Sequence, residues 1–362
     1  MTRRSLIIGG SAGALFLVVA AIAVVVVLNT VNQQAAEAVR SQVEAAIAES
    51  PMNDFLSVGE IGVRAAHGRI DIADVVFQDG NTSFRVDTLT VLLPRNEALA
   101  LSRNPDEATL TDAKIVVAGI DLRNRRGNTS FTFDELTVQI QGQVPTALFG
   151  DNPQEVLDNP ENGIRSIAVD LRGFSFAFPE GAGSIDLKSS SFGAQGDLRF
   201  ANLAEGGMAG GYASVLRQLK SISFELSDLG LVLTEAVREE MTAGIEGMVG
   251  PMPLLREPGI LQIGSLRLAS AVTDNTIEIS EFSASSMLMD FAGTAFVSLA
   301  PDLQPIPPLN VTLSVSQYHE ELRPLFSVLA QQVAMTELPD GSSFNFAVSI
   351  ADMNSTPVIT LE

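Results

Sequence analysis

The chain of 362 residues has no cysteine and no tryptophan, and only two tyrosines and two histidines. Without cysteine there is no disulfide, no iron–sulfur ligand and no thiol nucleophile. The scarcity of Trp and Tyr argues against aromatic platforms that stack sugars or bases. His67 and His319 have no converging ligands at a metal-binding spacing, and each is typical of a surface histidine. We therefore expect no metal site.

Motifs of known catalytic and phosphate-binding sites are also missing. The sequence has no Gly-x-Ser-x-Gly elbow, no His-Glu-x-x-His and no Walker loop. We therefore expect no catalytic residues and no cofactor, and we expect that the protein is not an enzyme.

Basic residues are few. The 22 Lys and Arg face 43 Asp and Glu, which gives a formal net charge of -21. A surface this negative repels nucleic acid and anionic lipid headgroups. We expect no nucleic-acid partner.

Charge is absent from one long stretch near the N-terminus, Ser5 to Leu28. At about 1.5 Å per residue, this stretch is long enough to cross a hydrocarbon layer of roughly 30 Å. Arg3 and Arg4 precede it, and no Lys or Arg follows before Arg40. The positive-inside rule then predicts a single-pass membrane anchor with a cytoplasmic N-terminus and the remainder of the chain outside the cytoplasm.

A cleaved signal peptide is the alternative to this anchor, because Ala21-Ile22-Ala23 resembles a cleavage site. However, residues 24–28 continue the apolar run where a signal peptide turns polar. An anchor is the better interpretation, and whether it is ever cleaved stays open.

The pattern after the anchor changes from helical to strand-like. Residues 29–50 have apolar residues spaced by four, typical of an amphipathic juxtamembrane helix that packs on its own domain or forms a coiled coil.

The domain plan predicted from the sequence has five parts: a cytoplasmic tip and transmembrane anchor at 1–28, the juxtamembrane helix at 29–50, first β-hairpin repeats at 51–144, a loop at 145–163, and a second β-rich region at 164–362 with helices near 234–249 and 319–333.

One segment occurs twice. Residues 81–91 (NTSFRVDTLTV) and 128–138 (NTSFTFDELTV) are identical at eight of eleven positions. Each begins with turn residues and continues as the return strand of a hairpin. The apolar positions of the two return strands, which we expect to share a buried face, are Phe84, Val86, Leu89, Val91, Phe131, Phe133, Leu136 and Val138. The Asp-x-Leu-Thr-Val portion breaks the alternation once in each copy, which predicts a matched bulge.

Further hairpins follow without any βαβ rhythm. The sequence predicts a mainly β fold with a few helices, in which an extended, mostly antiparallel sheet of hairpin repeats forms a curved or groove-like structure. Thr234 is placed to cap the helix near 234–249, and Pro305, Pro307 and Pro308 predict a stiff connector before a strand at 309–315.

A group of methionines stands near the predicted helix at 234–249 and in the strands after it. Met241, Met248, Met252, Met287 and Met289 have the flexible side chains that line adaptable apolar cavities. An ordinary hydrophobic core explains the same residues, and both interpretations remain open.

The start of the chain resembles AsmA-like proteins, which are bacterial inner-membrane proteins that face the periplasm. The resemblance rests on the basic N-terminus, the anchor, the amphipathic helix and hairpins such as GRIDIADVVF at 68–77 and FRVDTLTV at 84–91. The closing strands around 341–350 and 356–358 are similar as well. The resemblance implies a β-sheet groove with an apolar interior that serves lipid transfer or envelope maintenance. It implies no particular functional residue.

Two functions follow as expectations. The first is a membrane-anchored periplasmic protein that binds or transfers membrane lipid in an apolar groove, or maintains the envelope. The alternative is a non-enzymatic structural or assembly protein that engages an envelope protein partner.

Overall fold

The computed structural model describes residues 55–64, 67–103, 108–149, 157, 159–204, 215, 217–257, 259–273, 275–300, 304–352 and 357–362. The predicted anchor, with Ser5 and Leu28, and the predicted helix at 29–50 lie outside these residues and stay predictions. None of the helices in the described part of the chain has both the length and the apolar character needed to span a membrane.

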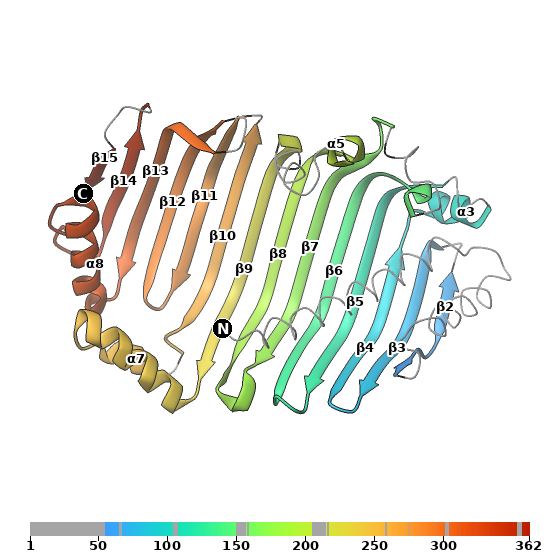
Figure 1. Ribbon diagram of the computed structural model, residues 1–362, viewed down its shortest axis with the longest axis horizontal. Coiled ribbons are helices and arrows are strands. Elements are labelled where there is room, and N and C mark those ends of the chain that lie inside the picture. Colours follow the sequence, from blue (N-terminus) through green and yellow to red (C-terminus); the bar gives the residue numbers. More distant parts are fainter. Residues whose placement is uncertain are drawn as a thin grey trace.

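The fold is one open antiparallel sheet (Figure 1). Its strands are β1 (Leu56–Ser57), β2 (Ile61–Arg64), β3 (Arg69–Asp79), β4 (Thr82–Leu92), β5 (Thr109–Asn124), β6 (Thr129–Pro145), β7 (Gly163–Ala177), β8 (Gly183–Arg199), β9 (Leu219–Leu233), β10 (Gln262–Thr273), β11 (Thr276–Ser286), β12 (Met289–Leu299), β13 (Pro305–Tyr318), β14 (Phe344–Ile350) and β15 (Val358–Leu361). From β3 onward each strand pairs with the next one in sequence, and β1 and β2 both pair with β3. The prediction of a mainly β, antiparallel fold with few helices is confirmed.

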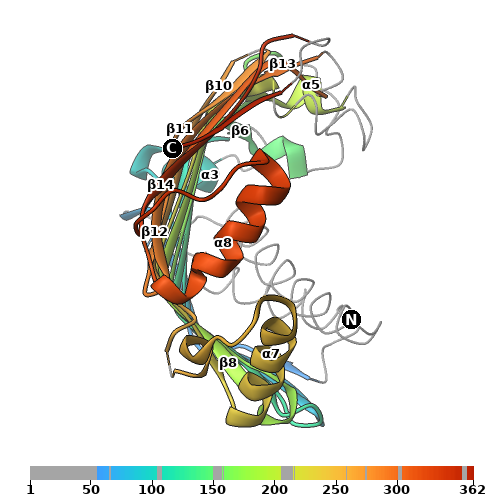
Figure 2. The ribbon, with the colours of Figure 1, turned by 90° about the vertical axis from the view of Figure 1, so that its left-hand side faces the viewer.

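The helices lie at the margins of the sheet. They are α3 (Arg95–Arg103), α5 (Phe200–Ala204), α7 (Glu235–Val249) and α8 (Arg323–Leu329), with short turns η3 (Thr146–Phe149), η4 (Pro179–Gly181), η5 (Pro253–Arg256), η6 (Glu320–Leu322) and η7 (Ala330–Ala334). Figure 2 shows that the sheet is curved and that α7 and α8 lie on its concave side. The sheet itself therefore forms the body of the molecule as a single layer.

Alternation along the strands gives the sheet one apolar and one polar face. A row of apolar side chains, interrupted only by Gly293, crosses the sheet from β3 to β15; we call it the apolar row. Successive members of the row are direct cross-strand partners: Ile70, Val91, Ile115, Val138, Val169, Phe192, Phe224, Leu268, Phe282, Gly293, Leu313, Phe346 and Leu361. With strands about 4.8 Å apart, the row is roughly 60 Å long.

The two copies of the doubled segment form β4 and β6, with β5 between them. Phe84 of β4 pairs with Leu122 of β5, and Leu122 pairs with Phe131 of β6. The repeated positions thus align across the sheet on the same apolar face. Tyrosine and tryptophan are not needed here, because Phe, Leu and Val supply the packing.

The bulge predicted at Asp87 and Asp134 needs correction. A bulge sets two residues against one and shifts the register. The pairing of β4 with β5 keeps the same register on both sides of Asp87, with Val86 opposite Ile120 and Thr88 opposite Ala118. The break in alternation is instead shared by both strands, because Gly119, opposite Asp87, has a left-handed φ of 66°.

One other local prediction is wrong, and another holds only for the position of the residue. Pro305 begins β13 and pairs with Leu299, so the prolines belong to a strand. The strand tolerates Pro307 and Pro308 because they fall where the register with β12 shifts and before pairing with β14 begins at Leu309. Thr234 occupies the N-cap position of α7, but its side chain makes no capping hydrogen bond.

Within the described residues, buried side chains form one cluster at each end of the sheet and a small third cluster on β8, β9 and β10. The N-terminal cluster contains Ile72, Val86 and Leu89, which are at most 2% exposed. The C-terminal cluster joins α7, η5 and α8 to the sheet around Met252 and Tyr318. Between these clusters the apolar face is only partly covered.

Candidate functional site

The middle of the sheet carries partly exposed apolar side chains on its apolar face. In the apolar row, Ile70 and Val91 are buried, whereas the members from Ile115 onward keep some exposure. Phe192 of β8 is 39% exposed. Burial of the exposed part of this side chain against an apolar partner would be favourable, because it removes apolar surface from water. The middle of the apolar face is therefore suited to binding an apolar partner.

A cavity of about 480 Å³ lies on this face. Its wall is almost entirely apolar, and Gln262 and Ser286 are the polar side chains in it. The complete lining is Ile185, Leu229, Gly230, Leu231, Ile260, Leu261, Gln262, Ile263, Leu266, Ala284, Ser286, Leu288, Met289 and Phe291. We call it the apolar cavity.

Strand pairing positions the floor of the apolar cavity. Leu266 of β10 pairs with Ala284 of β11, and Ala284 pairs with Phe291 of β12. Leu229 of β9 pairs with Ile263 of β10 one step further along the strands. Ala284 leaves open space between larger neighbours, which is why the floor is hollow at this point.

The segment between β9 and β10 supplies another wall through Ile260, which is 2% exposed. This segment contains α7 and η5. The Leu254 backbone N–H donates to Glu321 Oε2 at 2.9 Å, and the Met252 N–H donates to Glu246 Oε1 at 2.9 Å. These two bonds hold η5 against α7 and η6, so the wall is fixed from both sides.

The opposite face is polar, and many of its charges are paired with one another. Arg85 bridges Asp74 at 3.0 Å and Asp87 at 2.8 Å. Arg69 pairs with Asp71 at 2.7 Å, and this hydrogen-bonded guanidinium lowers the pKa of the Asp71 carboxyl below its ordinary value, against the opposing effect of partial burial. Such a face is suited to water.

A smaller hollow of about 200 Å³ lies along β6 to β9. Amide and hydroxyl side chains line much of it, and three of them, on β6 and β7, already bond within the chain. Gln139 donates to Asp112 at 2.9 Å, and Ser166 donates to Gln141 at 3.1 Å. We therefore do not take it as the site.

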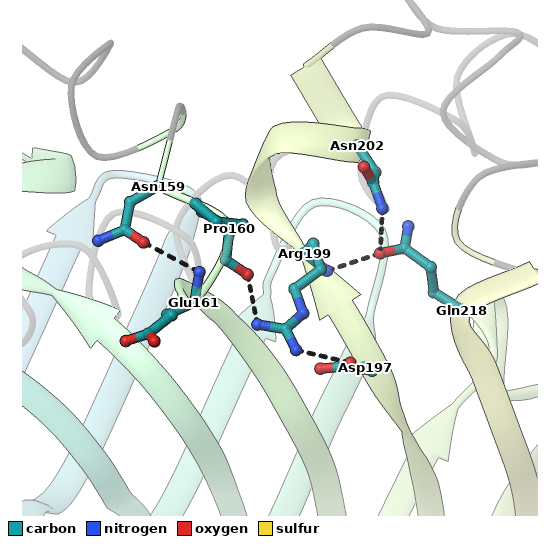
Figure 3. Close-up of polar contacts among 7 residues, drawn as sticks. All are labelled: Asn159, Pro160, Glu161, Asp197, Arg199, Asn202 and Gln218. Carbon is teal, nitrogen blue, oxygen red and sulfur yellow. Dashed lines mark hydrogen bonds and ion pairs between the residues drawn. The ribbon is translucent and has the colours of Figure 1, made fainter.

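Another polar cluster lies where β8 ends (Figure 3). The Arg199 guanidinium contacts Asp197 at 2.8 Å and donates to the Pro160 carbonyl. The Arg199 backbone N–H donates to Gln218 Oε1 at 2.7 Å, and the same oxygen accepts from Asn202 at 3.1 Å. Since these groups satisfy one another, the cluster holds the connections at this end of the sheet together.

Most of the repeat residues singled out from the sequence belong to the N-terminal cluster or pack against it, and none of them lines the apolar cavity. In β4 all four (Phe84, Val86, Leu89 and Val91) are buried, and in β6 Phe133 is buried while Phe131, Leu136 and Val138 are partly exposed. They build the sheet and line no cavity.

The histidines and methionines have different surroundings. His67 is exposed in the turn before β3, and His319 accepts a hydrogen bond from the Glu321 N–H at 3.4 Å. No group of potential metal ligands exists within the described ranges. Met289 lines the apolar cavity, Met252 belongs to the C-terminal cluster, and Met287 is 62% exposed. Met289 therefore fits the cavity interpretation, and Met252 fits the hydrophobic-core interpretation.

Sequence reasoning missed most of the cavity residues. Leu229, Ile263 and Leu266 are ordinary strand residues, and only the pairing of β9 with β10 and β11 brings them together. A usable signal was Ala284, a small residue at a position where Leu, Val or Phe stands in most other strands.

Comparisons with models of known protein families, with curated proteins and with solved structures find no match. The class of the protein is therefore defined by its fold and site alone. It is a single-layer antiparallel sheet with a polar face, an apolar face and an apolar cavity.

Proposed function

We propose that the protein binds lipid acyl chains on the apolar face of its sheet and acts in lipid transfer or envelope maintenance, as a non-enzymatic periplasmic protein of the AsmA-like type. The predicted anchor would hold it at the inner membrane. The observation that carries this proposal is the apolar row, which crosses the sheet from β3 to β15 and stays partly exposed over most of its length.

The size and lining of the apolar cavity support an acyl chain as the occupant. At about 480 Å³ the cavity falls within the range of small-molecule sites. Each methylene group removed from water contributes about 0.8 kcal/mol, so a chain segment of several methylenes binds without any hydrogen bond. The cavity offers few polar groups that would recognise a more polar ligand.

A second candidate function is favoured by a patch at the C-terminal end of the sheet. Val328 and Leu329 of α8 are 43% and 45% exposed, and Met335 is 91% exposed. Exposed apolar groups of this kind mark protein contact sites. An assembly protein that engages an envelope partner would use this patch, and crosslinking from Met335 in cells would then trap one dominant protein.

Copurification of lipid tests the proposed function. The whole chain and its Ala284→Phe variant are purified, and the lipid bound per protein is measured by mass spectrometry. Ala284→Phe fills the apolar cavity with an apolar group, so we expect bound lipid to fall several-fold without loss of folding.

Ala292→Phe is the matched control, because Ala292 is exposed on the polar face of the adjacent strand β12. It should bind as much lipid as the unchanged protein. Absence of lipid from the unchanged protein, or equal amounts in both variants, would overturn the proposal.

A further inference from the structure

A small pocket of about 70 Å³ adjoins the apolar cavity. The two share Leu231, Ile260 and Leu261 in their linings. Unlike the cavity, the pocket has charged groups in its wall, namely Arg238 from α7 and Glu257 from the loop after η5. An apolar hollow thus lies beside a charged one.

Arg238 and Glu257 have no ion-pair partner within the part of the chain that the structure describes. Their neighbour Arg256, on the same segment, pairs with Glu246 at 2.7 Å. The pocket therefore offers one cation, Arg238, and one anion, Glu257, to a ligand that carries both charges.

We propose that Arg238 and Glu257 bind the headgroup of a zwitterionic lipid that carries a phosphate and a primary ammonium, while its acyl chain occupies the apolar cavity. This inference rests on the proposed function. Arg238 donates charge-assisted hydrogen bonds to the phosphate, and Glu257 accepts them from the ammonium.

Charge and size select this headgroup over others. The formal net charge of -21 and the Glu257 carboxylate both disfavour a headgroup with net negative charge. A pocket of about 70 Å³ favours a compact ammonium over a bulky trimethylammonium. A quaternary ammonium also has no N–H to donate to a carboxylate.

Calorimetric titration of the purified chain with soluble dioctanoyl lipids tests this inference. The probes share their acyl chains and differ only in the headgroup: phosphatidylethanolamine, phosphatidylglycerol, phosphatidylcholine and diacylglycerol. We expect phosphatidylethanolamine to bind most tightly. Arg238→Gln should weaken its binding about tenfold, the effect of one charge-assisted hydrogen bond, and should leave diacylglycerol binding unchanged.

Glu257→Gln should weaken phosphatidylethanolamine binding, because the ammonium loses its carboxylate partner. It should also reduce the difference in affinity between phosphatidylethanolamine and phosphatidylglycerol, because the Glu257 carboxylate no longer repels the negatively charged headgroup. Arg256→Gln is the matched control and should bind all four probes as the unchanged chain does.

The outcomes separate this inference from the proposed function. If Arg238→Gln and the unchanged chain bind phosphatidylethanolamine equally, or if the four probes bind alike, the headgroup does not lie at this pocket and the proposed function still stands. If none of the probes binds, or if Ala284→Phe binds them all undiminished, the apolar cavity is not the lipid site and both proposals fall.

Discussion

Gly119 of β5 lies directly against the carboxylate of Asp87 on β4, so closely that a Cβ atom on Gly119 would approach Asp87 Oδ2 to 2.2 Å. The same relationship recurs one hairpin later, where a Cβ on Gly173 would approach Asp134 Oδ2 to 2.0 Å. Both glycines have a left-handed φ, 66° and 62°. Asp87 and Asp134 occupy the same position of the doubled segment, so each copy places an aspartate against a glycine of the next strand.

Replacement of this glycine should destabilise the sheet. Gly119→Ala places a Cβ against the Asp87 carboxylate and forces an alanine into the left-handed region, which alone costs about 1–2 kcal/mol. We expect the free energy of unfolding, measured by urea denaturation, to fall by at least this amount. Adding Asp87→Ala should recover the part of the loss that is due to the contact.

Gly230→Ala is the control for this prediction. Gly230 lies in β9, has no left-handed φ, and its nearest backbone neighbour is 4.0 Å from the added carbon. Its effect should be smaller than that of Gly119→Ala. If both changes lower the free energy of unfolding equally, neither the contact with Asp87 nor the left-handed backbone explains the effect of Gly119→Ala.

The fold was predictable because alternation and turns are local signals. The return strands show their apolar face in their own sequence, as in Phe84 and Val86, and several turns have a Gly or Asn, as at Gly80-Asn81. The break in apolar–polar alternation at Asp87 was visible in the sequence, but the sequence did not show whether it is a bulge. Whether the register shifts depends on Gly119, which belongs to another strand.

The pairing of Arg69 with Asp71 predicts a stability difference that depends on pH. Hydrogen bonds from Arg69 and from Thr90 stabilise the charged carboxylate, so the pKa of Asp71 is lower in the folded chain than its ordinary value of 3.8. The stabilisation is present above the unfolded pKa and is lost as the pH falls through the folded pKa. Because Arg69 is 44% exposed, the effect should stay below about 1 kcal/mol.

Urea denaturation of Asp71→Asn checks this sign. The variant should be less stable than the unchanged chain at neutral pH, and the difference should disappear in acid below the folded pKa of Asp71. Asp79→Asn is the control, since Asp79 is a β3 carboxylate without an ion pair among the described residues. A difference for Asp71→Asn that persists in acid would contradict the assignment.

Leucines of the two regions of the apolar face should differ in what they contribute to stability. Leu89 of β4 is 2% exposed, so Leu89→Ala removes fully buried methyl groups and should cost about 2–5 kcal/mol. Leu268 of β10 is only partly buried, and Leu268→Ala should cost about 1 kcal/mol. Chemical denaturation of both variants measures the difference. Equal losses would indicate that the middle of the sheet is covered as completely as its N-terminal end.

The candidate site was much less predictable than the fold. The apolar cavity depends on residues separated along the chain, such as Ile185, Ile260 and Phe291, and on the route of the segment between β9 and β10. The sequence predicts α7 in that segment from its spacing, but local spacing does not indicate where a helix packs. The Leu254–Glu321 bond, which fixes the route, joins residues 67 positions apart.

A charge in the apolar row should slow lipid transfer without emptying the apolar cavity. Phe192 lies in the middle of the row, is 39% exposed and does not line the cavity. Phe192→Glu should therefore leave the fold and bound lipid nearly unchanged, while an acyl chain that crosses this point must pass a carboxylate in an apolar surrounding. Transfer of fluorescent lipid between two vesicle populations should slow several-fold. Ser191→Glu places the same charge on the polar face and should have little effect, and equal rates for the two variants would mean that lipid does not move along the row.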